Sequence, residues 1–326
     1  MRVHFWGTRG SLPASVSNET IKKKIFKVIK AIGNLSFTSD EEIEKFLYRN
    51  YTNNNLPFSA IGSYGTNTSC IEIDGGDEFV LCDAGTGLRD FGNHVLKTIN
   101  QTHHQKPNVF NIFMSHLHWD HIQGFPFFTP AYMQGNHINI FGLHKELKDV
   151  FVAQQEPPFF PVPLKYMNAN IEFTVLEPGK TYDIAGFAVQ TIQQNHPGNS
   201  YGYKFEKDGR SIVYSTDSEH KDEAYDEDYT FLDFIRGADL LIFDAQYSLI
   251  DAISFKENWG HSSNIMGVEL SVKTDVKHLC IFHNEPTLDD ERLDQFLDDT
   301  RRYLKIFAES SPLKIDIAYD GMQIEI

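Results

Sequence analysis

Cysteine is scarce in this sequence, and no run of apolar residues is long. The three cysteines of the 326-residue chain are an odd number, lie far apart and sit in apolar, strand-like runs. Buried reduced thiols are therefore favoured over a disulfide or a zinc–thiolate site. They are Cys70, Cys82 and Cys280. No stretch approaches the roughly 20 apolar residues that a membrane helix needs, and the first residues, MRVHFWGTRGSLP, contain no apolar signal core. We therefore expect a soluble cytoplasmic protein without a membrane partner.

Positive charge is also in short supply. The chain has 29 Lys and Arg against 45 Asp and Glu, which gives a formal net charge of −16. Binding of a long nucleic acid depends on cationic side chains that displace counterions from the phosphate backbone. A long nucleic-acid partner is therefore disfavoured, whereas a small anion held by local donors is compatible with this charge.

Short β-type runs alternate with helical patterns along most of the chain. Helices are expected at 85–100, 143–155, 263–273 and 288–308. The expected strands are 3–7, 69–74, 78–85, 110–115, 137–142, 171–177, 187–193, 201–206, 211–217, 239–245, 278–284 and 314–320. This rhythm predicts an α/β protein large enough to bury a core without a disulfide or a metal ion. Most polar motifs follow strand ends, where α/β folds keep their sites.

Residues 15–58 interrupt this rhythm and read as a helical insertion, with helices at 19–33 and 39–49. In the first helix, five lysines lie outside an apolar stripe. Three interpretations stay open: a packed helix with a solvated basic face, a lid or dimer element that contacts an anionic ligand, or a membrane-surface helix. The stripe consists of Ile21, Ile25, Val28, Ile29 and Ile32.

Proline and aromatic residues crowd two other segments, 124–133 and 154–167. They form either a rigid loop that caps the core or an apolar wall beside a site, where a ring face meets a planar ligand. The candidate rings are Phe127, Phe128, Phe159, Phe160 and Tyr166.

The segment SHLHWDHIQG, residues 115–124, contains three histidines and an aspartate within six positions. Side chains two apart in an extended strand end point the same way, so we expect His116 and His118 to face one point while Trp119 turns into the protein. Asp120 and His121 follow at a turn and reach a second point nearby. Imidazole and carboxylate ligands suit Zn²⁺, with Mn²⁺ and Fe²⁺ as alternatives. The motif therefore predicts two adjacent sites for divalent metal ions.

Two metal ions need more ligands than this motif supplies, and three later strand ends offer them. His196 follows the strand at 187–193, Asp217 ends the run SIVYSTD, and His283 follows the apolar letters LCIF. Each is unremarkable alone, but together they complete a set of seven donors.

This order, HxHxDH followed by a histidine, an aspartate and a last histidine, resembles the metallo-β-lactamase fold superfamily over nearly the whole chain apart from 15–58. The resemblance implies a four-layer αββα sandwich, formed by residues 1–326 as a single domain with a helical insertion near the N-terminus. It also implies roles for the donors: His116, His118 and His196 bind one metal ion, Asp120, His121 and His283 bind the other, and Asp217 bridges them. Asp83 in LCDAGTGL is similar to the family's buried carboxylate that supports the ligand loop.

The stretch WGHSSNIMGVEL, residues 259–270, resembles the GHST loop of the RNase Z-like phosphodiesterases in this superfamily, in which a histidine protonates the leaving oxygen. Here the loop reads GHSS, and Asp244 stands where these enzymes often carry a glutamate. The resemblance makes His261 the candidate general acid, with Asp244 to orient it and Asp120 as a further catalytic candidate. The other interpretation of His261 is a structural residue of the N-cap region beside Ser262.

The motifs WGTRGSLP, GTNTSC, DAGTGLR, HWDHIQGFPFF, NHPG and DAQY together resemble bacterial metallo-hydrolases related to cyclic-nucleotide phosphodiesterases. We therefore expect hydrolysis of a small cyclic phosphodiester, first of all a 3′,5′-cyclic nucleotide, by attack of a metal-bound hydroxide. The alternatives are a tRNA 3′-processing endonuclease, a carbon ester or lactone hydrolase, and a metal-dependent sensor without turnover. Enzymes that resemble this chain are often dimers, so a homodimer is a further hypothesis.

Overall fold

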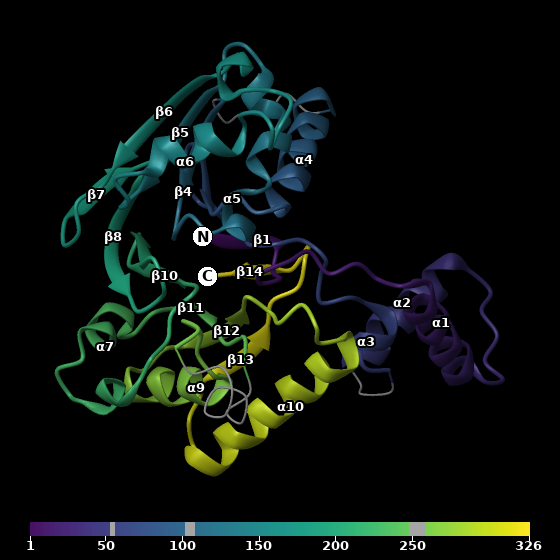
Figure 1. Cartoon of the computed structure of the whole chain (residues 1–326). Helices are drawn as coiled ribbons and strands as arrows, with labels where there is room; N and C mark the ends of the chain where they lie inside the picture. The colour runs from purple at the N-terminus through teal and green to yellow at the C-terminus, as the bar shows by residue number, and fades with distance from the viewer. Residues whose placement is uncertain (53–55, 102–107, 248–257) are drawn as a thin grey trace.

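Two mixed β-sheets pack face to face in the computed structural model, and helices cover the outer face of each (Figure 1). The structure describes residues 1–52, 56–101, 108–247 and 258–326. Residues 53–55, which fall within the predicted insertion, lie outside the described residues. The predicted four-layer αββα sandwich is confirmed.

The first sheet has the strand order β14–β1–β2–β3–β4–β5–β6. Its strands are β1 (Arg2–Gly7), β2 (Cys70–Asp74), β3 (Phe79–Cys82), β4 (Val109–Phe113), β5 (His137–Gly142), β6 (Asn170–Val175) and β14 (Gln323–Glu325). Strands β3 to β6 are parallel. Their outer face carries α4 (Gly87–Gln101), α6 (Leu147–Gln154) and the short turns η1 (Phe125–Phe127) and η2 (Thr129–Tyr132).

The second sheet has the order β13–β12–β11–β10–β9–β8–β7. Its strands are β7 (Thr181–Ile184), β8 (Phe187–Gln194), β9 (Ser200–Lys207), β10 (Arg210–Ser215), β11 (Leu240–Asp244), β12 (His278–Phe282) and β13 (Lys314–Ile317). Strands β10 to β13 are parallel. Helices α7 (Thr230–Ile235), α9 (Asn264–Lys273) and α10 (Asp290–Phe307) cover its outer face.

The main hydrophobic core lies between the two sheets. Strand β1 buries every second residue, because one of its faces looks inward. Strand β11 buries all five residues, because α9 covers its outer face while the other sheet covers its inner one. The ring of Phe113 packs edge-on against Tyr203 of the opposite sheet, with centroids 5.4 Å apart. All three cysteines are buried and free, as predicted.

The sequence pattern predicted the long elements and missed the short ones. All twelve expected strands are present, and the four expected helices appear as α4, α6, α9 and α10. Strands β7 and β14 and the short helices α3 (Phe58–Ile61), α5 (Trp119–Ile122) and α7 were not predicted, because a stretch of three to six residues shows no reliable period. Within the described residues, no helix combines the length and the apolar character needed to cross a membrane.

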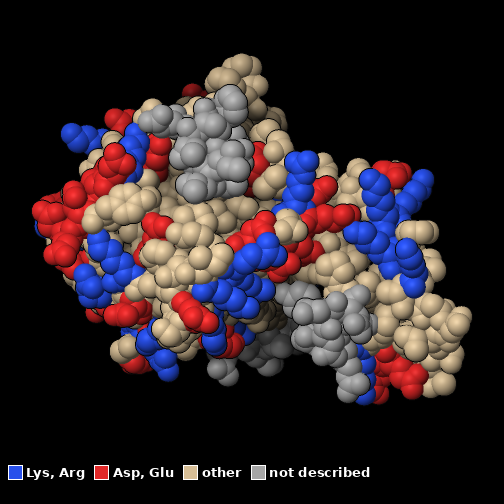
Figure 2. Space-filling model, turned by 90° about the horizontal axis from the view of Figure 1, so that it is seen from below, with Lys and Arg blue, Asp and Glu red and all other residues tan. Residues whose placement is uncertain are grey.

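The predicted insertion forms α1 (Asn18–Ile32) and α2 (Asp40–Thr52), which project from the side of the sandwich (Figure 1). The orientation of α1 contradicts a simple packed helix with a solvated basic face. Ile21, Ile25 and Ile29 of the predicted stripe are exposed, and α1 contains no fully buried residue. Figure 2 shows Lys and Arg side chains gathered on this projecting part of the molecule, next to uncharged residues.

The reason for this orientation is a binding site for one ammonium group at the base of the insertion. Lys24 Nζ donates to the carbonyl oxygens of Ser59, at 2.7 Å, and Gly62, at 2.5 Å. It also pairs with the Asp290 carboxylate at 2.6 Å, and Asp290 accepts a hydrogen bond from the backbone nitrogen of Tyr64 at 2.9 Å. Burial of these acceptors favours a cation there, so α1 turns Lys24 inward and its isoleucines outward.

Replacing Lys24 by methionine keeps the apolar stem and removes the charge. We expect the free energy of unfolding to fall by about 1–3 kcal/mol, because the two carbonyls and Asp290 lose a charged donor. Lys22 is exposed and serves as the matched control; Lys22→Met is expected to change stability by less than about 0.5 kcal/mol. Urea unfolding measures both variants, and equal stability of the two would contradict this account of the insertion.

Candidate metal centre

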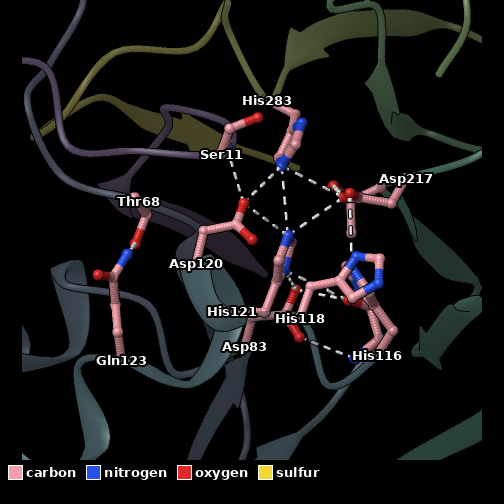
Figure 3. A network of polar contacts seen from close by, with 12 residues as sticks. Ser11, Thr68, Asp83, His116, His118, Asp120, His121, Gln123, Asp217 and His283 are labelled. Atoms are coloured by element: carbon pink, nitrogen blue, oxygen red, sulfur yellow. Dashed lines mark hydrogen bonds and ion pairs between the residues drawn. The ribbon is translucent and has the colours of Figure 1, made fainter. Parts of the chain in front are cut away.

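The seven predicted donors converge where strands of both sheets end. Figure 3 labels these donors apart from His196. His116 and His118 follow β4, and α5 carries Asp120 and His121. The remaining donors follow strands of the second sheet: His196 after β8, Asp217 after β10 and His283 after β12. Because the two sheets face each other, their loops meet at this edge of the sandwich and build one centre from distant parts of the chain.

The backbone at this edge is held in an unusual conformation. Asp83, Asp217 and His283 have φ angles of 61°, 49° and 61°. Such left-handed conformations cost non-glycine residues of the order of 1–3 kcal/mol each, and they persist where the surrounding structure enforces them. Each of the three ends a buried strand abruptly, so that its carboxylate or imidazole lies at the centre.

One group of four donor atoms has the spacing of a metal cage. The Nε2 atoms of His121 and His283 lie 3.2 Å apart, and Asp120 Oδ2 is 3.3 Å from the first and 3.2 Å from the second. Asp217 Oδ1 is 3.3 Å from His121 Nε2 and 3.4 Å from His283 Nε2. Ligands at zinc distances in a tetrahedral site are separated by about 3.3–3.4 Å. The residues therefore fit a divalent metal ion.

A second group adjoins the first through the same aspartate. His118 Nδ1 lies 3.1 Å from His196 Nε2, and Asp217 Oδ2 lies 3.6 Å from His116 Nε2 and 3.7 Å from His196 Nε2. The buried Nε2 atom of His116 has no hydrogen-bond partner. An orphaned buried nitrogen is unfavourable unless a ligand meets it. The two carboxylate oxygens of Asp217 thus face two separate groups, each with a donor set that suits a divalent ion.

The charge states of the carboxylates and of the histidine group suit a metal ion. Burial raises the pKa of Asp217, but the imidazoles of His283 and His121 outweigh it and hold this pKa well below its usual range. The pKa of Asp120 is likewise lowered, because His121 outweighs the effect of burial. Burial lowers the pKa of three imidazoles and keeps them neutral: His116, His118 and His196. Ionised carboxylates and neutral imidazoles are the forms that bind metal ions. Burial lowers the pKa of His121, but the carboxylates of Asp120 and Asp217 outweigh it and hold this pKa well above its ordinary value, so a metal ion in the cage would replace a proton on this imidazole.

Asp83 lies beneath the centre, fully buried, and accepts four hydrogen bonds. His121 Nδ1 donates to it at 2.7 Å, and so do the backbone nitrogen and the hydroxyl of Ser115 and the hydroxyl of Tyr214, each at 2.7 Å. Because Nδ1 of His121 is occupied in this way, its Nε2 faces the donor cage. The structure therefore puts Asp83 where it supports the loop that carries the ligands.

His261 lies beside the two donor groups. Its Nδ1 is 2.8 Å from Asp244 Oδ2, and its ring stacks on His283 with centroids 5.1 Å apart. Burial lowers the pKa of His261, but the Asp244 carboxylate outweighs it and raises this pKa to about 9. Ser263, two residues further on, caps α9 with its own side chain. The structure thus joins His261 to Asp244 and leaves the capping of α9 to another residue.

Backbone groups complete the centre, and sequence reasoning missed them. The nitrogen of Ser11 donates to Asp120 Oδ2 at 2.7 Å, and the carbonyl oxygen of Gly260 lies 2.9 Å from His196 Nδ1. A Cβ atom on Gly260 would lie 2.1 Å from His196 Nδ1, and one on Gly10 would lie 2.5 Å from His283 Nδ1. Contacts of this kind have no side-chain signature; the one signal was that both glycines lie in noted motifs, GTRGSLP and WGHSS.

Two expectations about aromatic residues need correction. Trp119 is 56% exposed and does not turn into the protein, because α5 begins at this residue and ends the strand-like alternation. In the proline-rich segments, Phe128 is fully buried and caps the outer core, whereas Phe127 and Phe159 are exposed. The two segments meet where the ring of Phe127 packs edge-on against Phe160. The capping interpretation therefore holds for Phe128, and an apolar wall beside a site stays a prediction for the exposed rings.

Paired groups of histidines and aspartates at one edge of an αββα sandwich define a class of metal-dependent hydrolases. The chain belongs to this class: the domain model of the beta-lactamase superfamily matches residues 78–284. That range contains all seven predicted donors, the last of which is His283. The predicted superfamily and the likeness to RNase Z are confirmed.

Curated relatives share one name. The ribonuclease Z of Thermoplasma acidophilum is 23% identical over 284 residues, which cover 72% of this chain and 87% of that protein. The ribonuclease Z of Picrophilus torridus is 26% identical over 266 residues, which cover 66% and 81%. These names conflict in part with our expectation that a long nucleic acid is disfavoured.

Solved structures share the fold. The metallo-beta-lactamase fold protein YhfI from Bacillus subtilis has a TM-score of 0.63 at 16% identity, covering 100% of this chain and 98% of that one. Human tRNase Z, short form, has a TM-score of 0.57 at 18% identity over 100% and 99%. Unliganded yeast PDE1 has a TM-score of 0.59 at 13% identity over 79% and 95%.

The two glycines offer a way to disturb each donor group separately. We expect Gly260→Ala to displace His196 and Gly10→Ala to displace His283, and each to weaken zinc binding by about 10- to 100-fold at one group, as loss of supporting contacts does. Gly135 has a φ of 92° and nothing near its Cβ position, so Gly135→Ala controls for backbone strain. Zinc titration of the three variants measures this; full zinc affinity in Gly260→Ala and Gly10→Ala would contradict the geometry.

Proposed function

We propose that this hydrolase cleaves nucleoside phosphodiesters, with a 3′,5′-cyclic nucleotide as the preferred substrate. The observation that supports this most is the pair of His261 and Asp244, 2.8 Å apart and beside both donor groups. Release of an alkoxide from phosphorus needs a proton, and a histidine next to a metal centre can deliver it. Hydrolysis of a carbon ester or lactone by the same donors would not need this histidine.

We assign two divalent ions to the donor groups, with zinc favoured over manganese and iron. His116, His118 and His196 would hold one ion, Asp120, His121 and His283 the other, and Asp217 would bridge them. The ions would supply Lewis-acid polarisation of the phosphoryl group and activation of the attacking water. This assignment agrees with the orientation of Asp217, whose Oδ2 faces His116 of the first group and whose Oδ1 faces His121 of the second.

Residues of the chain itself orient the donors and supply the proton. Ser11 holds Asp120 Oδ2 through its backbone nitrogen, so the carboxylate keeps one orientation during attack. His261 uses Nδ1 to donate to Asp244, which leaves its Nε2 for the leaving oxygen of the substrate. After Nε2 has given its proton to that oxygen, a proton from solvent water returns His261 to its starting form. Asp244 is fully buried and also accepts from the backbone nitrogens of Ser218 and Gln246, so it is a fixed support for His261.

A second candidate function is cleavage of an RNA precursor in the manner of ribonuclease Z. The names of the curated relatives favour it, and the lysines of α1 on the projecting insertion are a surface that an RNA backbone could contact (Figure 2). The net charge of −16 favours the small substrate. The two candidates share the chemistry at phosphorus and differ in what the rest of the surface binds.

A substrate panel separates these functions. We expect the zinc- or manganese-loaded protein to hydrolyse bis(p-nitrophenyl) phosphate and at least one 3′,5′-cyclic nucleotide, and Asp120→Ala to abolish both activities. Cleavage of a precursor tRNA without cyclic-nucleotide turnover would replace the first candidate by the second. If the protein hydrolyses none of these phosphodiesters, both candidate functions are contradicted and a carbon ester or lactone becomes the favoured substrate class.

The role of His261 is tested by the leaving group. We expect His261→Ala to lower cyclic-nucleotide turnover by about 10²- to 10⁴-fold, because the alkoxide must be protonated, and to affect bis(p-nitrophenyl) phosphate far less, because p-nitrophenolate is a weak base. His137 lies on β5 away from the centre, so His137→Gln is the control. Metal content is measured alongside. Equal losses on both substrates at full metal content would argue against a proton-donor role.

A further inference from the structure

Two of the three tryptophans in the chain are exposed, and each is next in the chain to a residue that belongs to the metal centre or contacts it. Trp119 is 56% exposed and Trp259 is 58% exposed. A tryptophan side chain normally buries most of its large apolar surface, about 150–250 Å². Two large exposed indoles in one part of the surface are therefore unfavourable in water and typical of a place where a ligand binds.

Both tryptophans sit on backbone segments that contact the same half of the centre. Trp119 directly follows His118, and Trp259 directly precedes Gly260, whose carbonyl oxygen lies 2.9 Å from His196 Nδ1. His118 Nδ1 and His196 Nε2 are themselves 3.1 Å apart. The two segments therefore meet at the histidine group, and Trp119 also directly precedes Asp120 of the neighbouring group.

The same half is the open side of the centre. His118 is the exposed member of its donor group, whereas His116 and His196 are buried. Gly198 faces His118 without a side chain, and even an added Cβ atom would stay 3.8 Å from its Nε2. The exposed side of His118 is therefore the side from which a ligand can reach this donor group, next to the segments that carry the two indoles.

We propose that Trp119 and Trp259 form a stacking subsite for the heterocyclic base of the substrate. The position of the phosphate in this arrangement rests on the proposed function, but stacking of a base does not require turnover. Every nucleobase offers a π face, so the subsite selects nucleoside phosphates over alkyl phosphates and discriminates weakly among bases. The exposed rings Phe127 and Phe159 of the proline-rich segments are then not the main contact for the base.

Two product-like ligands that differ only in the base test this subsite. The affinity of the zinc-loaded protein for adenosine 5′-monophosphate is compared with that for ribose 5-phosphate by competition and by tryptophan fluorescence. We expect adenosine 5′-monophosphate to bind about 5- to 150-fold more tightly in the unaltered protein, the range that stacking of one base provides. This affinity ratio is expected to fall close to one in the double variant Trp119→Ala/Trp259→Ala. It is expected to be largely kept in Phe127→Ala and in Phe159→Ala.

The affinity for ribose 5-phosphate is expected to stay unchanged in all variants, because it reports the phosphate site alone. Phe307→Ala, which removes an exposed ring at the end of α10, is the control. A ratio that survives in the double variant, or that collapses in Phe127→Ala or Phe159→Ala instead, would overturn the subsite. If the affinity ratio falls in the double variant but the unaltered protein hydrolyses no phosphodiester, the subsite is supported and the proposed function is contradicted. If the protein hydrolyses a phosphodiester but the double variant keeps the ratio, the proposed function is supported and the subsite is contradicted.

Discussion

A single buried carboxylate, that of Asp83, joins the two sheets to the metal centre. It receives Ser115 from the end of β4, Tyr214 from β10 in the opposite sheet, and Nδ1 of His121. A buried carboxylate is tolerable only when its oxygens are satisfied, so these donors and the carboxylate fix one another. The orientation of His121 follows, and with it the spacing to Asp217 on which both donor groups depend.

The packed strands of the sandwich hold the backbone rigidly, and the residues that follow the strand ends carry the donor atoms. Residues such as Asp217 and His283 adopt left-handed backbone conformations that a loop on its own would avoid, and the packed strands before them hold that conformation in place. The fold thus brings ionised carboxylates to metal-cage distances from the imidazoles, and the imidazoles of the histidine group are neutral. Donors held by rigid strands in this way keep a fixed geometry toward a bound ion.

Much of this was predictable from the sequence, for a physical reason. The donors His116, His118 and His283 follow apolar runs typical of buried strands, so each could be expected at a strand end. These strands belong to different sheets, and it was the resemblance of the motif order to a known fold that brought their ends together. The sequence could not reveal contacts made by backbone atoms, such as Ser11 with Asp120, or the orientation of α1. That orientation depends on Lys24 and Asp290, which are 266 positions apart, and no local period encodes such a pair.

In the proposed centre, two ions share Asp217 and take their ligands from both sheets. The proposed attack on phosphorus and the proposed proton transfer from His261 both depend on this arrangement. The most direct test is zinc-edge anomalous diffraction from crystals of the zinc-loaded protein. We predict two peaks about 3.5–4 Å apart, one on each side of the Asp217 carboxylate, as in other two-metal hydrolytic sites. A single peak among His116, His118 and His196, with no second ion near His283, would contradict the account.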